Sequence, residues 1–335
     1  MIKEAVKQVV EGKDLSYDTA KQVMNEIMSG EASQMLVSAY LVALRMKGET
    51  IDEITASAEG MRSHAESFPY EGDLFEIVGT GGDEANSFNI STTSALIVSA
   101  AGIPVAKHGN RSVSSKSGAA DVLEAAGVDI NISPQKSADV LKKIGISFMF
   151  AQKYHPAMKN VGPVRKEIGL RTIFNILGPL TNPAHANFQL LGVYDESLVK
   201  PLAEVLVKLG VKKGMVVYGQ DRLDEISLSA NTTCAEIDNG KITEYVINPE
   251  DYGFTKCEKD ALAGGDCAEN AKILRAVLDG SDKGAKRDAA VLNSAACIHI
   301  FKGVSMEDAI KEANEVIDSG KALTQLDRFV ELTNA

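Results

Sequence analysis

The sequence of 335 residues is 44% hydrophobic and 24% charged, and its 35 basic and 46 acidic residues give a net charge of −11. This composition is typical of a globular protein with enough apolar residues for a sizeable core. The negative charge argues against non-specific binding to nucleic acid, although it permits a local basic pocket for a small phosphorylated ligand. Tryptophan is absent and aromatic residues make up 5%, so we expect no base-stacking platform and no nucleic-acid partner.

No run of about 18 apolar residues occurs, and the first residues lack the apolar core of a signal peptide. We therefore expect a cytoplasmic protein with no membrane partner. The four cysteines have no CxxC spacing, so we expect free thiols and neither disulfides nor a zinc site.

Apolar residues recur at helical spacing through residues 1–72, with no strand pattern among them. Three stripes predict three helices, the second ending at Gly30 and the third at Gly48. The run Thr50-Ile-Asp-Glu53 has the form of a capping box and predicts the start of a fourth helix. So many apolar faces on short helices need a partner surface, which is either the rest of the chain or a second copy. We therefore expect a helical domain that forms a homodimer.

From residue 73 onward, short apolar runs alternate with amphipathic segments, which predicts a mainly parallel sheet covered by helices. The expected strands are 74–78, 103–106, 146–150, 189–193 and 215–218, followed by an antiparallel pair at 234–237 and 242–247. The expected helices are 91–101, 117–126, 133–145, 198–209, 268–278, 284–301 and 305–319. Residues 160–186, punctuated by proline and glycine, are expected to return to the helical domain. The predicted division is therefore 1–72 with 160–186 as the helical domain, and 73–159 with 187–335 as the α/β domain.

A glycine-rich turn, Gly79-Thr-Gly-Gly-Asp83, follows the first expected strand. Glycine adopts positive φ and has no Cβ, so such a backbone can approach a ligand closely and turn its N–H groups inward. The next helix would point its N-terminus at the same anion, and Ser91 or Thr92 suits its cap. The turn therefore predicts a phosphate cradle, with an ordinary strand-to-helix turn as the alternative. Its spacing is not that of the dinucleotide-binding fingerprint.

Three cations lie in the ten residues Lys107-His-Gly-Asn-Arg-Ser-Val-Ser-Ser-Lys116, which follow the second expected strand. Carboxyl ends of parallel strands meet at one edge of a sheet, so this loop should lie beside the glycine turn. Arg111 offers a bidentate fork and Lys107 a point charge, which favours binding of several phosphate groups. The alternative is a solvated loop.

The adjacent acids Asp224 and Glu225 follow the expected strand 215–218 and suit Mg²⁺, a cation that takes oxygen ligands and bridges to phosphates. Alternatively, they are surface acids. His108 and His155 adjoin the expected site loops and are interpreted as substrate contacts, because no Ser, His and Asp arrangement for nucleophilic catalysis is evident. Arg165 is a further candidate that could point back toward the sheet.

Nine short motifs, in this order, resemble those of the anthranilate phosphoribosyltransferase family and span nearly the whole chain. They are Gly79-Thr-Gly-Gly-Asp83, Asn89-Ile-Ser-Thr92, Lys107-His-Gly-Asn-Arg-Ser-Val-Ser-Ser115, Ala120-Asp-Val-Leu-Glu124, His155-Pro-Ala-Met158, Pro163-Val-Arg165, Arg171-Thr-Ile-Phe-Asn175, Leu177-Gly-Pro-Leu180 and Leu223-Asp-Glu-Ile-Ser227. One glycine motif alone would be weak evidence, whereas nine in register are specific.

The resemblance implies transfer of the phosphoribosyl group of phosphoribosyl pyrophosphate (PRPP) to the amine of anthranilate in tryptophan biosynthesis, with Mg²⁺ as cofactor. It also implies the two-domain architecture of nucleoside phosphorylases and phosphoribosyltransferases, with a homodimer through the helical part. The residues implied for PRPP are Gly79, Gly82, Asp83, Ser87, Asn89, Ile90, Ser91, Thr92, Lys107, His108, Gly109, Asn110, Arg111, Ser112, Val113, Ser114, Ser115 and Ala119. Those implied for anthranilate are Gly79, His108, Asn110, His155, Arg165, Gly178 and Pro179, and those implied for the metal are Ser91, Asp224 and Glu225.

Two positions depart from the family pattern: Ser87 stands where threonine is common, and Ala119 stands where a PRPP-contacting serine is common. The first keeps a hydroxyl, whereas the second removes a phosphate hydrogen bond of about 1.5–3 kcal/mol unless water or Ser117 replaces it. No catalytic residue is certain. His108 and Arg165 are expected to position substrate, because the neutral amine of anthranilate needs orientation more than deprotonation.

Two other functions are weighed against this one. A nucleoside phosphorylase of similar architecture would not need the acidic pair, and it would need a base-recognising pocket in place of His155 and Arg165. A non-catalytic nucleic-acid-binding relative predicts a basic surface and a degraded metal site, in contrast to the net charge of −11 and the intact Asp224-Glu225 pair.

Overall fold

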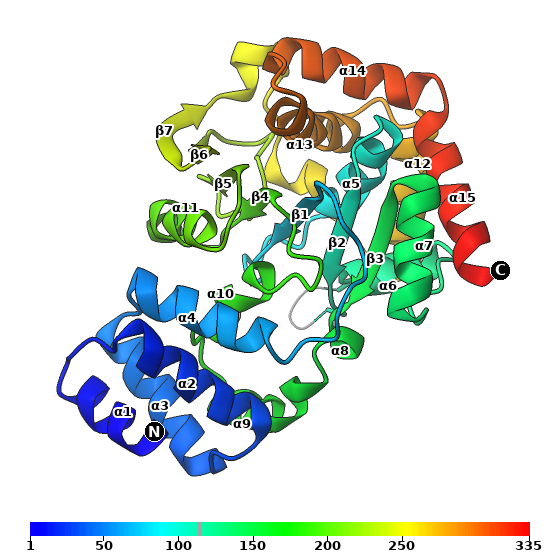
Figure 1. Ribbon diagram of the computed structural model, residues 1–335. Helices are drawn as coiled ribbons and strands as arrows, with labels where there is room; N and C mark the ends of the chain where they lie inside the picture. Colours follow the sequence, from blue (N-terminus) through cyan, green and yellow to red (C-terminus); the bar gives the residue numbers. More distant parts are fainter. Residues whose placement is uncertain (113–115) are drawn as a thin grey trace.

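The computed structural model describes residues 1–112 and 116–335 and shows a helical bundle beside an α/β domain (Figure 1). The bundle begins with the four expected helices, which are α1 (Ile2–Val10), α2 (Tyr17–Ser29), α3 (Gln34–Lys47) and α4 (Ile51–Arg62). Side-chain oxygens of Ser16 and Ser33 accept N–H groups in the first turns of α2 and α3. Thr50 and Glu53 form the expected capping box of α4, so the local signals for these helices are confirmed.

The α/β domain is built on a seven-stranded sheet of order β3-β2-β1-β4-β5-β6-β7. Its strands are β1 (Phe75–Gly79), β2 (Val105–Gly109), β3 (Ile146–Phe150), β4 (Phe188–Gly192), β5 (Lys213–Gly219), β6 (Thr232–Asp238) and β7 (Lys241–Ile247). The first five pair in parallel and the last two antiparallel, as expected. All seven expected strands are therefore confirmed.

Helices cover both faces of the sheet (Figure 1). They are α5 (Ile90–Ala100), α6 (Ala119–Ala125), α7 (Pro134–Ile144), α11 (Val199–Lys208), α12 (Cys267–Leu278), α13 (Ala285–Lys302), α14 (Met306–Asp318) and α15 (Lys321–Asn334). Along β4, Leu190 packs into the core that contains α5 and α13, whereas Leu191 packs into the core shared with α11 and the bundle. The period-two alternation of strand side chains thus produces two cores, one on each face.

The last helix was not expected. α15 follows α14 after Ser319 and Gly320, and Gly320 has a φ of 76°. Ala322, Leu326 and Phe329 form a buried stripe at helical spacing. The sequence therefore carried the signal of this helix, although the expected helices ended at residue 319.

The segment between β3 and β4 contains α8 (Ala151–Tyr154), α9 (Gly162–Ile168) and α10 (Phe174–Leu177). α9 lies against α3, α10 contacts α4, and the Nδ2 of Asn160 donates to the Met28 carbonyl at 2.7 Å. This stretch therefore runs along the bundle, while the domain division at 72, 160 and 186 stays a prediction.

Of the helices in the described residues, none is by itself long and apolar enough to cross a membrane. Only α13 and α14 taken together, with a bend of 118° between them, reach that length and composition among those residues. The four cysteines are free thiols, as expected.

Candidate active site

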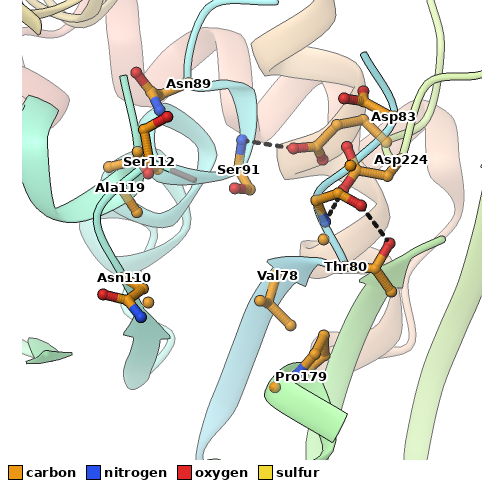
Figure 2. Close-up of a pocket in the computed structure, with 18 of the residues that line it drawn as sticks. Val78, Thr80, Asp83, Asn89, Ser91, Asn110, Ser112, Ala119, Pro179 and Asp224 are labelled. Atoms are coloured by element: carbon orange, nitrogen blue, oxygen red, sulfur yellow. Dashed lines mark hydrogen bonds between the residues drawn. The ribbon is translucent and has the colours of Figure 1, made fainter. Parts of the chain in front are cut away.

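A cleft of about 610 Å³ opens at the carboxyl ends of β1 and β2, between the sheet and the segment that precedes β4. Figure 2 shows residues that line it, from the glycine turn, the loop after β2, the 178–180 turn and the acidic pair. The cleft contains most of the residues that the sequence singled out. They are Gly79, Gly82, Asp83, Ser87, Asn89, Ile90, Ser91, Thr92, Lys107, His108, Gly109, Asn110, Arg111, Ser112, Ala119, Arg165, Gly178, Pro179, Asp224 and Glu225.

Four candidate residues are not among these. Val113, Ser114 and Ser115 lie outside the described residues. His155 is 3% exposed, and within the described part of the chain it is not one of the side chains that line the cleft. Its ring packs edge-on against that of His108, with 5.0 Å between centroids, so it lies behind the cleft wall.

The glycine turn is built around Asp224. Gly79 and Gly192 are paired across β1 and β4, and a Cβ on them would lie 2.2 Å from Asp224 Oδ2 and 1.6 Å from the Asp224 carbonyl oxygen, respectively. Gly81, at a φ of 69°, donates its N–H to Asp224 Oδ2 at 2.7 Å. Glycine is thus required at Gly79 and Gly192 by close packing and at Gly81 by backbone conformation.

Glu225, the second residue of the acidic pair, accepts a hydrogen bond from the first turn of helix α5. The N–H of Ser91 donates to Glu225 Oε1 at 3.1 Å, as Figure 2 shows. The expectation that Ser91 or Thr92 caps the helix is wrong, because α5 already starts at Ile90 and Asn89 occupies the N-cap position. The Asn89 amide instead donates to the Ser117 carbonyl at 3.1 Å and so links the two loops of the cleft.

Asp224 and Glu225 are 9% and 8% exposed. Burial, followed by repulsion from Asp83 and Glu225, raises the pKa of Asp224 well above its usual value. Burial also raises the pKa of Glu225 to about 7, against the opposing effect of Lys107. Among the described atoms, Asp83 Oδ2 is also buried without a hydrogen-bond partner. The geometry thus concentrates carboxylate oxygens that a cation would stabilise.

These oxygens suit Mg²⁺, whose coordination shell is completed by water and substrate, better than they suit a metal whose ligands all come from the protein. Within residues 1–112 and 116–335, no group of three or more His, Cys, Asp and Glu side chains is arranged to hold a metal. Mg²⁺ usually binds through one or two carboxylates and completes its shell with water and substrate phosphate. An all-oxygen pair beside a phosphate cradle satisfies that requirement.

Strands β1 and β2 separate at their carboxyl ends, where the cleft lies. Phe75 and Val105 are the residues that pair between the two strands. Beyond this pair, main-chain groups of the strands form hydrogen bonds with side chains instead of with each other. The N–H of His108 donates to the Glu76 carboxylate at 3.0 Å, and Lys107 Nζ donates to the Ile77 carbonyl at 2.5 Å. Both side chains are buried, and burial raises the pKa of Glu76 to about 8 and lowers that of Lys107.

Glu76 was missed by the sequence analysis, although a glutamate inside an apolar strand was a visible signal. Lys107 also donates to Ser91 Oγ at 3.2 Å, so its charge lies directly behind the cradle. The two side chains hold the strand ends apart and place one cation beneath the glycine turn.

The two histidines of the site are buried and neutral at neutral pH. Burial is the main cause that lowers the pKa of His108 to about 3 and that of His155 to about 4. Hydrogen bonding to the carbonyls of Gly178 and Thr181 opposes these shifts in part. Neither ring therefore carries a proton that titrates near pH 7.

Arg111 is engaged differently from the expectation. Its guanidinium pairs with Asp121 at 2.9 Å and with Glu124 at 2.8 Å. Asp121 also accepts the N–H groups of Ser112 and Gly118, each at 2.9 Å. In this structure the two carboxylates on α6 occupy the fork of the guanidinium, and the binding of phosphate by Arg111 stays a prediction. Arg111 and Asp121 instead fasten the two ends of the loop.

Two further cations face the cleft from the segment before β4. Arg165 stacks on Phe174 with 5.4 Å to the ring centroid, and burial lowers its pKa. Arg171 lies 4.4 Å from the centroid of Tyr194 and donates to the carbonyl of Gly82. Arg171 belongs to one of the nine motifs but is not among the predicted site residues, because nothing in its local sequence shows that it reaches the glycine turn.

Comparison with known families supports the class that this fold and cleft define. The helical bundle domain of the glycosyl transferase family matches residues 3–65, and the a/b domain of that family matches residues 71–323. The chain is thus a glycosyl transferase with a bundle and an α/β domain.

Individual relatives make the assignment narrower. The chain is 64% identical to the anthranilate phosphoribosyltransferase of Lachnoclostridium phytofermentans, covering 100% of the chain and 99% of the relative. It is 58% identical to that of Methanobrevibacter smithii, over the full length of both. The Thermus thermophilus anthranilate phosphoribosyltransferase superposes with a TM-score of 0.94 at 41% identity over 99% of each chain. The Saccharomyces cerevisiae enzyme in complex with PRPP and Mg superposes with a TM-score of 0.91 at 27% identity, over 99% of this chain and 98% of that one. The chain belongs to the anthranilate phosphoribosyltransferase family.

Proposed function

We propose that this chain transfers the 5-phosphoribosyl group of PRPP to the amine of anthranilate, forming N-(5-phosphoribosyl)anthranilate and pyrophosphate. Its relatives carry this enzyme name, and yeast relatives were solved with PRPP and Mg and with 4-fluoroanthranilate. The observation in this chain that carries the proposal is the buried pair of Asp224 and Glu225 facing the glycine turn. The reaction belongs to tryptophan biosynthesis.

For PRPP we propose the glycine turn, the start of α5 and the loop after β2 as the binding surface. Gly82, at a φ of 76°, and the N-terminus of α5 present main-chain N–H groups suited to phosphate oxygens. Lys107 supplies a cation directly behind them. Val113, Ser114 and Ser115, which lie outside the described residues, are proposed for the same surface on the family resemblance alone.

For the metal we propose Ser91, Asp224 and Glu225 as the residues that hold Mg²⁺. Burial is the main cause of the raised pKa values of both acids, and repulsion from Asp83 adds to it, so a bound cation would favour their charged forms. When bound, Mg²⁺ supplies positive charge that stabilises the departing pyrophosphate. Glu225 would then have to release or share the Ser91 N–H that it accepts in this structure.

For anthranilate we propose the part of the cleft bounded by Gly79, His108, Asn110, Arg165 and Pro179. Arg165 would pair with the substrate carboxylate and turn the amine toward the sugar. A bond then forms between the amine nitrogen and C1 of the ribose as the bond from C1 to pyrophosphate breaks, and the nitrogen afterwards releases one proton to water. Because the amine is already neutral and His108 stays neutral, orientation is sufficient and no general base is required before attack.

His155, proposed from the sequence as a contact of anthranilate, would act through its packing against the ring of His108. The cleft wall formed by His108 would then stay in place without direct contact between His155 and substrate. This is a positioning role.

We also propose a homodimer through the helical bundle. Met35 and Met46 are 82% and 83% exposed on α3. They lie eleven positions apart, about three helical turns, and therefore on one face. Together with the apolar faces of the short helices, these two side chains offer apolar area that a second copy of the bundle would bury.

The test of the proposed activity is the loss of anthranilate fluorescence when PRPP and Mg²⁺ are added. The double variant Asp224→Asn/Glu225→Gln should reduce kcat/KM for PRPP by at least about 100-fold, because it removes the charges that complement the metal. A matched control is Glu250→Gln/Asp251→Asn, an adjacent acidic pair in an exposed turn, which should retain full activity. No fluorescence change with the unmodified chain would refute the proposal.

A further inference from the structure

The turn formed by residues 178–182, here named the roof turn, covers one side of the cleft. Gly178 and Pro179 line the cleft directly, as does Val78 of β1, and Figure 2 labels Pro179 and Val78. The turn begins as a short 3-10 helix, Gly178–Leu180. Its position at the strand ends makes it part of the wall that an aromatic substrate would touch.

Side chains from distant parts of the chain hold the carbonyl groups of the roof turn. Gln189, on β4, donates its Nε2 to the Pro179 carbonyl at 2.9 Å. Arg62, the last residue of α4, donates its Nε to the Leu180 carbonyl at 2.8 Å. The Gly178 carbonyl accepts from the N–H and hydroxyl of Thr181, at 3.2 Å and 3.1 Å. The turn is thus fixed by the sheet on one side and by the bundle on the other.

The far end of the turn is fixed to β2. Asn182 donates its Nδ2 to the Ala106 carbonyl at 2.8 Å and accepts the Ala184 N–H at 2.8 Å. Ala106 lies where β2 has already separated from β1, so a side chain replaces a main-chain partner there. The opening between the strands and the turn above it are therefore parts of one arrangement.

Gln189 is a member of this arrangement that hydrogen-bonds directly to a lining residue and can be altered without changing the lining itself. It is 2% exposed, and it is not among the described residues that line the cleft. Its amide reaches Pro179, which does line it. A missing donor here would leave a buried carbonyl without its partner, and Pro179 would shift to regain one.

We propose that Gln189 is a positioning residue for the acceptor half of the cleft, through its hydrogen bond to Pro179. This inference rests on the proposed function, in which Pro179 borders the anthranilate site. The phosphate-binding loops receive no hydrogen bond from Gln189 among the described residues, so its effect falls on one substrate only.

The test compares Gln189→Met, which keeps the length of the side chain and removes its donor, with a matched control. Gln325 on α15 is also buried and donates its Nε2 to a main-chain carbonyl, that of Ile144, in a different part of the fold. Gln325→Met therefore loses the same kind of bond away from the cleft. We expect Gln189→Met to raise the KM for anthranilate about tenfold and to change the KM for PRPP by less than about twofold, since a buried carbonyl loses its donor.

Two further variants support the comparison. A glutamic acid at this buried site stays protonated and can donate to Pro179, so Gln189→Glu should restore much of the anthranilate KM. If Gln189→Met does not fold, Gln189→Asn, which is polar but one methylene shorter, replaces it with the same expected split in KM.

Several outcomes would overturn the role of Gln189. One is an anthranilate KM in Gln189→Met, or in its substitute Gln189→Asn, that equals the unmodified value or that of Gln325→Met. Another is an equal rise in both KM values, which would mean that the bond supports the whole cleft. Failure of the unmodified chain to consume anthranilate would instead refute the proposed function, so the two failures are distinguishable.

Discussion

The contact between Gly192 and Asp224 allows a quantitative prediction. Gly192 is buried at the end of β4, and a Cβ added there would lie 1.6 Å from the Asp224 carbonyl oxygen and 2.3 Å from its carbonyl carbon. Both are main-chain atoms, so no rotamer change relieves the overlap. For Gly192→Ala to reach an ordinary contact of 3.4 Å, the main chain at Asp224 must move by about 1.8 Å.

This displacement has two costs. It breaks the hydrogen bond from Gly81 N–H to the Asp224 carboxylate, which is worth about 1.5–3 kcal/mol. Overpacking of a buried position adds about 1–3 kcal/mol. We therefore expect the free energy of unfolding to fall by about 2.5–6 kcal/mol. We also expect kcat/KM for PRPP to fall at least about 100-fold, because a misplacement of about 1 Å already costs that much.

The assay measures kcat/KM for PRPP at saturating anthranilate over a range of Mg²⁺ concentrations, together with thermal unfolding. The control is Gly162→Ala at the start of α9, since a Cβ there meets nothing within 4 Å in the described part of the chain. A folded Gly192→Ala variant with an unchanged Mg²⁺ requirement and an unchanged KM for PRPP would refute the reasoning from this contact.

Two further predictions concern Ala119 in the cleft and the two exposed methionines of α3. Ala119→Ser places a hydroxyl in the cleft at the first turn of α6, and a new hydrogen bond to phosphate of about 1.5 kcal/mol should lower the KM for PRPP about tenfold. A steady-state titration checks this, and an unchanged or higher KM would show that water or Ser117 already fills the role. Met35→Lys combined with Met46→Lys should weaken the proposed dimer at least about 100-fold, because each buried methionine is worth about 1.5–3 kcal/mol. Sedimentation velocity measures it, with Val246→Lys as the exposed control, and a monomeric unmodified protein at micromolar concentration would contradict the dimer.

Local patterns were sufficient for every strand and for all helices that cover the sheet except α15, and they located the main loops of the cleft. The glycine turn could be recognised because positive φ and close approach select glycine at Gly81 and Gly79. The loop after β2 and the acidic pair could be placed beside it because parallel strands bring their carboxyl ends to one edge. These inferences need only neighbouring residues and the topology of a parallel sheet.

The contacts between distant segments could not be read in the same way. The sequence does not show that Arg111 pairs with Asp121 and Glu124, nor that Arg171 reaches the carbonyl of Gly82. Similarly, the sequence does not show that the ring of His155 packs against that of His108, and its contact with substrate stays a prediction. Which partner a long side chain takes depends on the packing of whole elements.

The amino-acid sequence by itself determined the two-part architecture, the strand order along the chain and the chemical character of the cleft, because these follow from short-range periodicity and turn chemistry. Only the tertiary structure decided how the cleft is held open. The side chains of Glu76, Lys107 and Asn182 form hydrogen bonds with main-chain groups where β1 and β2 separate. The side chain of Gln189 forms a hydrogen bond with the turn above them. Buried polar groups must find partners, and in this fold those partners come from segments that meet only when the sheet and the bundle are packed together.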